Sequence, residues 1–301
     1  MLKQSVLNVL MYYDIFHYPL TIEEIFKSCD QKCSRAQVEC IVEELVDDKI
    51  IFRFEKFYSL HNKLDLILRR LDGNQRADRY LKIAHLFIKI IASFPFVRAI
   101  FVSGSVSKNY ADKNSDVDFF VIAAPNKVWI LKVMLVLFKK TFLLNHNKFF
   151  CANYLIDSDH LTISNKNIYT SLEIVTLIPV YGKSYCQKFY EENEWVKDFY
   201  PNYPLPSLEQ VPKSRRRSGK FIMEMLLSNK LGNKLDDLML KLVTKYWKIK
   251  HGKNYKSQDD YQAAITNTKQ TSRAHWRNFH KSVFVDLETK KEAFRNTSLV
   301  D

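Results

Sequence analysis

The stretch from 102 to 124, VSGSVSKNYADKNSDVDFFVIAA, decides the fold. It places Gly104 between two serines at the end of the apolar run 97–102, in a chain of 301 residues that has only six glycines. Asp116 and Asp118 then open a second apolar run. Glycine lets a backbone approach a ligand closely because it has no Cβ, and alternate residues of a strand point to one face. We therefore predict two strands joined by a short helix, with both carboxylates on the same face.

The residues around Gly104 and the two aspartates predict a site for a divalent cation and a phosphate chain. Two carboxylates this close raise each other's pKa unless a cation lies between them, and oxygen ligands suit Mg²⁺ or Mn²⁺. Serine hydroxyls and the amides that open the short helix can donate to phosphate oxygens. We predict metal ligands at Asp116 and Asp118 and phosphate-binding residues at Ser103, Gly104, Ser105 and Lys108. The alternative is a polar turn that opens an edge strand.

The order of helix, strand, Gly-Ser, short helix and strand with Asp-x-Asp resembles the core of the DNA polymerase β-like nucleotidyltransferases. Gly104 and Ser105 are followed by ten residues and then by Asp116, Val117 and Asp118. The resemblance covers about residues 80 to 180. It implies binding of a nucleoside triphosphate such as ATP at the glycine and serines. It also implies that an acceptor hydroxyl attacks the α-phosphorus while metal ions stabilise the attacking and leaving oxygens.

The resemblance also implies a third carboxylate on a later strand, and here this chain departs from the pattern. The matching position in KFFCANYLID, residues 148–157, is Asn153, which offers an oxygen but no charge. A missing charge weakens the second metal site. We predict Asp116, Asp118 and Asn153 as catalytic residues, with Asp157 as the alternative to Asn153 because both share strand parity. Three functions stay open: an active transferase, a nucleotide-binding regulator with impaired catalysis, and a nucleic-acid-binding protein.

The first 65 residues are typical of a winged helix-turn-helix. An apolar helical stripe covers 2–13, capping boxes begin at Thr21 and Ser34, and two alternating runs follow at 50–54 and 57–60. In DNA-binding versions the third helix enters the major groove. Here that helix carries five acidic residues and one arginine, which would repel phosphates. We favour an interaction or homo-oligomer role over DNA reading.

The remaining pattern predicts an α+β fold with a mixed sheet at its centre. Gly73 breaks the chain, and Pro-bearing residues 200–212 form a linker. A further strand is predicted at 148–156, and helices are predicted at 75–93, 126–144, 167–180, 221–249 and 259–279. The predicted domains are a winged helix at 1–65, a nucleotidyltransferase core at 75–185 and a basic helical domain at 186–301.

The net charge of +13 is concentrated near the C-terminus. Residues 212–281 carry seventeen Lys or Arg against five Asp or Glu, which predicts a surface for nucleic acid or another polyanion, or simply a solvated helical face. The resemblance implies that this helical part shapes the acceptor side of the cleft. Five cysteines, an odd number, and no secretory segment favour a reduced cytoplasmic setting. Lysines interrupt the most apolar run, so we predict neither a membrane span nor a membrane partner.

Overall fold

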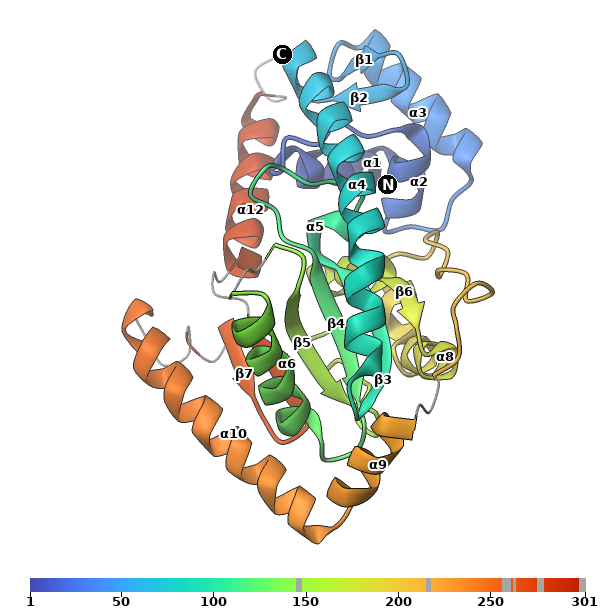
Figure 1. Ribbon diagram of the computed structural model, residues 1–301. Helices are drawn as coiled ribbons and strands as arrows, with labels where there is room; N and C mark the ends of the chain where they lie inside the picture. The colour runs from blue at the N-terminus through green and yellow to red at the C-terminus, as the bar shows by residue number, and fades with distance from the viewer. Residues whose placement is uncertain (145–147, 215–217, 256–260, 262–263, 275–278, 298–301) are drawn as a thin grey trace.

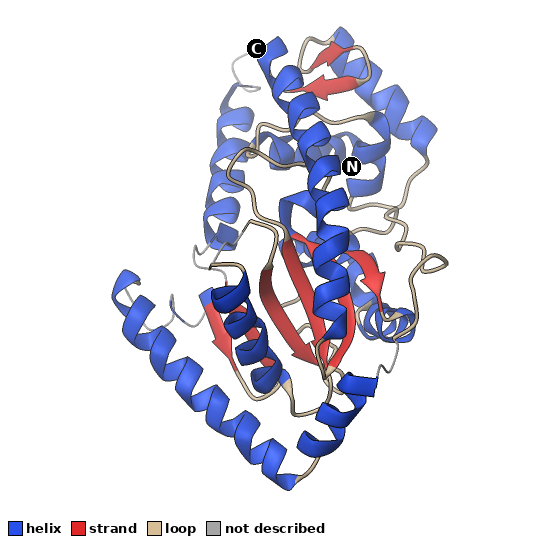
Figure 2. Cartoon of the chain, in the orientation of Figure 1, coloured by secondary structure: helices blue, strands red, loops and turns tan. Residues whose placement is uncertain are grey.

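A mixed sheet lies at the centre of the molecule (Figures 1 and 2). The computed structural model describes residues 1–301 except 145–147, 215–217, 256–260, 262–263, 275–278 and 298–301. Within those residues the sheet has the strand order β6-β3-β4-β5-β8-β7, and only the β4–β5 pair is parallel. The strands are β3 (Val97–Ser103), β4 (Asp118–Ala123), β5 (Cys151–Asp157), β6 (Ile178–Tyr181), β7 (Ile265–Asn267) and β8 (Thr271–Ala274). This confirms the predicted mixed-sheet α+β core.

Each face of the sheet is covered by a different set of helices. Phe119 and Val121 point to one face, which packs against α4 (Leu64–Ser93) and α6 (Val128–Phe142) and lies toward the viewer in Figure 1. We call this the α4/α6 face. Phe120 and Ile122 point to the other face, where the core includes α7 (Ile168–Val175), α8 (Lys183–Glu192) and residues of the first 60 positions. Alternate strand residues therefore separate the two cores. We call this second face the module face, because residues 1–60, described next as the N-terminal module, contribute to its core.

The first 60 residues form what we call the N-terminal module. It contains α1 (Leu2–Asp14), α2 (Ile22–Ser28), α3 (Arg35–Asp47), β1 (Phe52–Phe54) and β2 (Phe57–Ser59). Both predicted capping boxes are present, because the side chains of Thr21 and Ser34 accept from the backbone amides of Glu24 and Gln37. β1 and β2 form an antiparallel hairpin. The predicted element order is confirmed, whereas winged-helix identity stays a prediction.

The expected break at Gly73 is wrong, because α4 runs through it without interruption. The Tyr110 ring packs directly on this glycine, and a Cβ built there would lie 2.3 Å from Tyr110 Cε2. The carbonyl of Gly73 accepts from the amide of Ala111 at 3.1 Å, and the Asn74 side chain donates to the carbonyl of Asn109. Gly73, which the sequence marks as a helix breaker, therefore lies inside α4 and gives the loop after α5 (Gly104–Ser107) a surface to pack on.

Of two helices predicted in the C-terminal half, 167–180 is confirmed only as far as Val175, and the described part of 259–279 is mostly strand. α7 ends at Val175, and residues 178–181 form β6, which pairs antiparallel with β3, instead of continuing the predicted helix 167–180. The described part of 259–279 contains β7 and β8, which extend the sheet through β5. Strand pairing with the core overrides local helical periodicity in both places. The predicted helix 221–249 is divided into α9 (Ser218–Leu227) and α10 (Lys230–His251).

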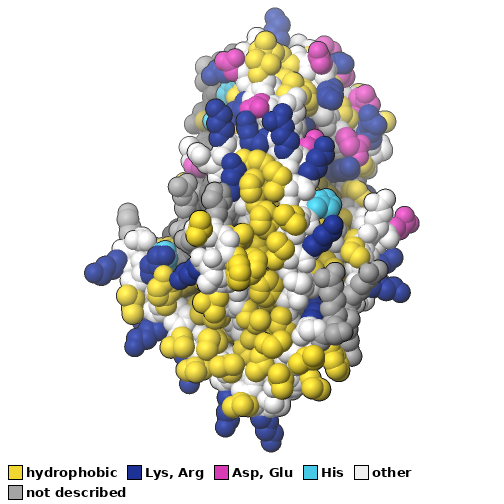
Figure 3. Space-filling model, viewed as in Figure 1, with side chains coloured by type: hydrophobic (Ala, Val, Ile, Leu, Met, Phe, Trp, Pro, Cys, Tyr) yellow, Lys and Arg dark blue, Asp and Glu magenta, His cyan; other side chains and the backbone are white. Residues whose placement is uncertain are grey.

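α10 packs on α6, and the last described helix, α12 (Phe279–Thr297), packs on α1. The buried carboxylate of Asp236 in α10 accepts from the backbone amides of Trp129 and Ile130, both at 2.8 Å. Figure 3 shows many hydrophobic side chains on the side that carries α4, α6 and α9. Even so, no helix in the described ranges reaches the length and hydropathy that crossing a bilayer requires.

Arg70 fixes the N-terminal module to α4, and its replacement by alanine should destabilise the protein. Its guanidinium is 5% exposed and donates to both carboxylate oxygens of Glu24, at 2.9 and 2.8 Å. It also lies 4.4 Å from the ring centroid of Tyr18. Its removal takes away a buried guanidinium and its packing but leaves Glu24 partly in water, with a side chain 33% exposed, which together costs about 2 kcal/mol. We expect Arg70→Ala to lower the free energy of unfolding by that amount in urea titrations.

The control is Arg53→Ala, which removes an arginine from an exposed pair with Glu43. Exposed pairs contribute about 0.5 kcal/mol. Equal losses for the two variants would show that Arg70 does not anchor the module.

Candidate active site

Gly104 and Asp118 meet where β3 ends and β4 begins. Ser103 and Asp118 are register partners in the antiparallel β3–β4 pair. Gly104 follows with φ +74°, the left-handed region that favours glycine. A Cβ at this position would lie 2.5 Å from Asp118 Oδ2, so no other residue lets the backbone and this carboxylate come so close. The short helix α5 then starts at Gly104 and carries Ser105.

Asp118 is held in an environment that resists its negative charge. The pKa of its carboxyl is raised to about 7, first by burial and then by the charges of Asp116 and Glu173. Lys108 acts in the opposite direction. Asp116 lies two residues before Asp118, just outside β4, and the amide of the intervening Val117 donates to the carbonyl of Lys148 at 2.8 Å. The predicted pair of acids is therefore electrostatically coupled, and a bound cation would relieve its repulsion.

Asn153 lies beside Asp118, where the sequence places the expected third carboxylate. Its amide Nδ2 donates to Asp118 Oδ1 at 2.6 Å. The Cys151 thiol in turn donates to Asn153 Oδ1 at 3.0 Å, and burial raises the pKa of that thiol to about 12, which keeps it protonated. Asn153 thus uses its amide hydrogens to orient the carboxylate. Its oxygen accepts one hydrogen bond, from the thiol.

Asp157 does not lie near this site, so the alternative to Asn153 is wrong. In the parallel β4–β5 pair Cys151 is the partner of Asp118, whereas Asp157 is the partner of Ala123 at the far end of the strands. Five further residues of strand correspond to about 17 Å. The buried Asp157 carboxylate accepts from the backbone amides of Asn126 and Asp159, at 2.7 and 2.8 Å. It holds two loops together and cannot reach Asp118.

The site contains a further acid that the sequence did not reveal. Glu173 in α7 forms an ion pair with Lys108, Nζ to Oε1 at 2.8 Å, and the same ammonium donates to the carbonyl of Gly104 at 3.2 Å. Lys108, a predicted phosphate ligand, therefore bridges the glycine turn and Glu173. No local signal marks Glu173, because it lies 65 residues from Lys108 and inside an apolar helix.

These residues open into one cavity of about 790 Å³. Its wall includes all four predicted phosphate-binding residues, namely Ser103, Gly104, Ser105 and Lys108, together with Asp118, Asn153 and Glu173. Asp116 is not among the lining residues, although its charge raises the pKa of Asp118. The cavity thus brings hydrogen-bond donors, a cation and carboxylates together, which is the composition of a site for phosphoryl chemistry.

A comparison with protein families identifies this part of the chain. Residues 86–156 match the family model of the nucleotidyltransferase domain. The chain carries a nucleotidyltransferase domain. This confirms the predicted resemblance to DNA polymerase β-like nucleotidyltransferases and supports a transferase in general terms. The match contains Gly104, Asp116, Asp118 and Asn153, whereas Glu173 and the N-terminal module lie outside it. Comparisons with curated proteins and with solved structures gave no match.

Enzymes with a nucleotidyltransferase domain typically depend on a divalent metal ion. The donor set fits such an ion, because Asp116 and Asp118 offer hard carboxylate oxygens and the half-buried Asp118 has two acidic neighbours that raise its pKa. Across the described ranges, no three His, Cys, Asp or Glu side chains form a ready metal cluster. Waters and substrate oxygens would have to complete the shell, as is usual for Mg²⁺.

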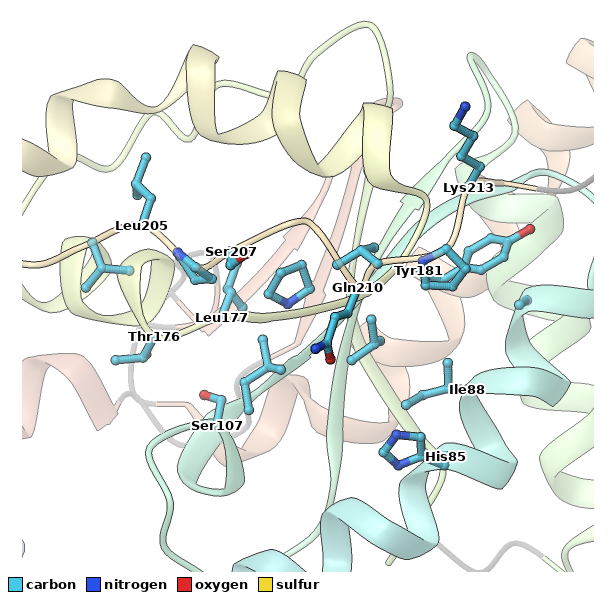
Figure 4. A pocket seen from close by; sticks show the side chains of 18 of the residues that line it. His85, Ile88, Ser107, Thr176, Leu177, Tyr181, Leu205, Ser207, Gln210 and Lys213 are labelled. Atoms are coloured by element: carbon cyan, nitrogen blue, oxygen red, sulfur yellow. The ribbon is translucent and has the colours of Figure 1, made fainter.

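A second cavity, of about 970 Å³, lies outside the nucleotidyltransferase site. It is lined by α4, β6 and the strap 203–213 (Figure 4). In Figure 4, His85 and Ile88 come from α4 and Leu205 and Lys213 from the strap. None of the described residues that line it is acidic, so this lining lacks the groups that transfer needs.

Proposed function

We propose that the protein moves a nucleoside monophosphate from a nucleoside triphosphate, such as ATP, to an acceptor hydroxyl and releases pyrophosphate. The observation that carries this proposal is the contact between the left-handed Gly104 turn and the half-buried Asp118 carboxylate. It joins a phosphate cradle to an acid that could hold Mg²⁺ or Mn²⁺. A bound Mg²⁺ would neutralise developing charge on the attacking and leaving oxygens. We place the reaction in the cytoplasm.

Each residue of the site has a separate task in this proposal. The backbone of Gly104 and Ser105 holds the phosphate chain at the start of the short helix, with the hydroxyl of Ser103 beside it. Lys108 adds a positive charge to the leaving pyrophosphate. Asn153 keeps Asp118 in one rotamer through its 2.6 Å hydrogen bond. Catalysis then rests mainly on positioning and charge neutralisation.

Glu173 is the best candidate for accepting the proton of the attacking hydroxyl. It lines the same cavity as Asp118 and comes from a separate element, α7. General-base catalysis contributes about 10²- to 10⁴-fold. We expect Glu173→Gln to lower kcat by about 10²-fold with little change in the Kd for the nucleotide, measured by single-turnover transfer and by calorimetry. A matched control is Glu192→Gln on α8, which should leave both quantities unchanged.

A direct test is incubation of the protein with each α-labelled nucleoside triphosphate, Mg²⁺ or Mn²⁺, and cell extract. The proposal expects pyrophosphate release and one labelled acceptor, both absent in the Asp116→Ala plus Asp118→Ala variant. Nucleotide binding without any turnover would instead support a catalytically impaired regulator. Labelling that both proteins produce equally would reject the transferase.

The nucleic-acid alternative predicts that affinity for RNA or DNA falls steeply with salt. Its expected surface, residues 212–281, includes α10, and several of these residues lie outside the described ranges. No contact of the described residues favours it over transfer.

A further inference from the structure

The N-terminal module forms one wall of the cavity that contains Asp118. The module residues that line it follow one another at the end of α1 and in the next turn: Tyr12, Tyr13, Ile15, Phe16, His17 and Tyr18. Their rings pack together, with centroids 5.6 Å apart for Tyr12 and Phe16. Tyr110, Phe120 and Tyr154 line the same cavity from the core. The space next to Asp118 is therefore bounded by aromatic side chains from two separate parts of the chain.

Asp118 points toward the module and away from the basic helix α10. It has the strand parity of Phe120, whose ring packs on the module face, and Phe119 between them points to the α4/α6 face. α10 packs on α6, on that opposite face. The expectation that the basic C-terminal helices shape the acceptor side of the cleft is therefore wrong for α10. Because Asp118 points to the module face, the N-terminal module lies on the acceptor side of the cleft instead.

The aromatic wall is held in place before any ligand binds. The Arg69 guanidinium donates to the carbonyls of Phe16 and His17, at 3.0 and 3.1 Å, and lies 4.9 Å from the ring centroid of Tyr110. Tyr110 meets Tyr18 edge to face with centroids 5.8 Å apart. Its ring also rests on Gly73, where any Cβ would collide with it. Because these contacts hold the wall on the module side and on the core side, less conformational entropy is lost when a ligand binds against it.

The chemistry of the wall selects a class of molecule. The six lining residues of the module include no acidic side chain, no lysine and no arginine. Arg69 of α4 also lines the cavity, but its guanidinium donates to two carbonyls of the module, so this side offers mainly ring faces and hydroxyls. Aromatic walls with a few polar groups are typical of small-molecule sites, and about 790 Å³ lies within their usual range of roughly 300–1,000 Å³. A nucleic-acid acceptor would need a positively charged groove.

We propose that the N-terminal module is the acceptor site of the enzyme and that the acceptor is a small, uncharged, ring-bearing alcohol. The inference rests on the proposed transferase function. The ring of the acceptor lies against Tyr12, Phe16 and Tyr110, and its hydroxyl faces Glu173 and Asp118. The module thus serves as part of the substrate cavity.

The test uses two uncharged probes, phenyl β-D-glucopyranoside and tyrosol, with the full-length protein. Ligand-observed NMR gives their Kd values, and calorimetry gives the Kd of Mg-ATP. Phe16→Ala removes a half-buried ring but keeps the carbonyl that Arg69 binds. We expect it to raise the Kd of the bound probe, and its KM in transfer, by about 10-fold and to leave the Kd of Mg-ATP unchanged. The matched control, Phe142→Ala, removes a 73% exposed ring from α6 and should change neither.

Several outcomes would overturn the proposal. One is that neither probe binds at millimolar concentration. Another is that Phe142→Ala raises the Kd of the probe as much as Phe16→Ala does. A third is that Phe16→Ala raises only the Kd of Mg-ATP, because the wall would then bind the nucleobase. The proposal would also be overturned if the protein transferred nucleotide to an RNA oligonucleotide and the Lys241→Glu plus Lys245→Glu variant in α10 lost that activity. Because probe binding is measured without nucleotide, it can succeed even if no transfer is detected. That result would reject the transferase function and retain the ring-binding site.

Discussion

Asp118→Asn should abolish nucleotidyl transfer and at the same time make the protein more stable at pH 8 in metal-free buffer. The two effects share one cause, which is a poorly solvated carboxylate with two acidic neighbours. Loss of a group that organises charge at the reacting phosphate costs at least about 10³-fold in rate. We expect kcat to fall by that factor, measured by release of labelled pyrophosphate at saturating nucleotide.

The direction of the stability effect follows from the pKa of Asp118. Its folded-state value of about 7 lies above the ordinary 3.8, so between these pH values the folded protein binds more protons than the unfolded chain. Stability from this group is therefore present at pH 4 and lost as the pH rises through 7. Above pH 7 the folded state has to hold the charge. A neutral asparagine removes that penalty, so we expect a gain of about 2–4 kcal/mol at pH 8 and little gain at pH 4.

Asp157→Asn provides the matched control, because Asp157 is another aspartate of the same sheet, is buried, and lies at the far end of β5. It accepts from two backbone amides, and an asparagine can satisfy them less well. We expect this variant to lose stability at pH 8 and to keep transfer activity. Thermal unfolding at both pH values measures the difference. A less stable Asp118→Asn protein, or one with more than a tenth of the activity, would contradict our reading of the site.

The residues that the sequence identified are those whose position depends on local geometry. Gly104 and Asp118 could be placed because a strand, a tight turn and a second strand leave few ways to arrange them. The capping boxes at Thr21 and Ser34 were recognisable for the same reason, since each involves residues three positions apart. Local hydrogen bonds and alternation were enough for these features.

What the sequence did not reveal depends on contacts between distant segments. Glu173 reaches the site through an ion pair with Lys108, 65 residues away, and looks like any acid in an apolar helix. Gly73 has the signature of a break, yet it lies inside α4 because Tyr110 packs on it. Strands β6 and β8 become strands because β3 and β5 offer free edges for pairing. The role of the module as a wall also depends on this tertiary arrangement.

Gly104→Ala should reduce transfer by at least about 10²-fold while the fold persists. At φ +74° an alanine costs about 1–2 kcal/mol, which a domain of this size tolerates. The larger effect is steric, because the new Cβ would lie 2.5 Å from Asp118 Oδ2 and must push the carboxylate away from the phosphate cradle. A displacement of about 1 Å is enough for a loss of this size. Pre-steady-state transfer and binding of Mn²⁺, followed by electron paramagnetic resonance, should both weaken.

Gly219→Ala is the control for this substitution. A Cβ at Gly219, in helix α9, meets no atom within 4 Å, so alanine should leave transfer unchanged and stabilise the helix by about 0.5–1 kcal/mol. The contrast between the two glycines separates a general effect of added side chains from the specific need for bare backbone beside Asp118. If Gly104→Ala binds Mn²⁺ and transfers nucleotide as the parent protein does, the turn is not a phosphate cradle, and the polar-turn interpretation of residues 102–124 is the better one.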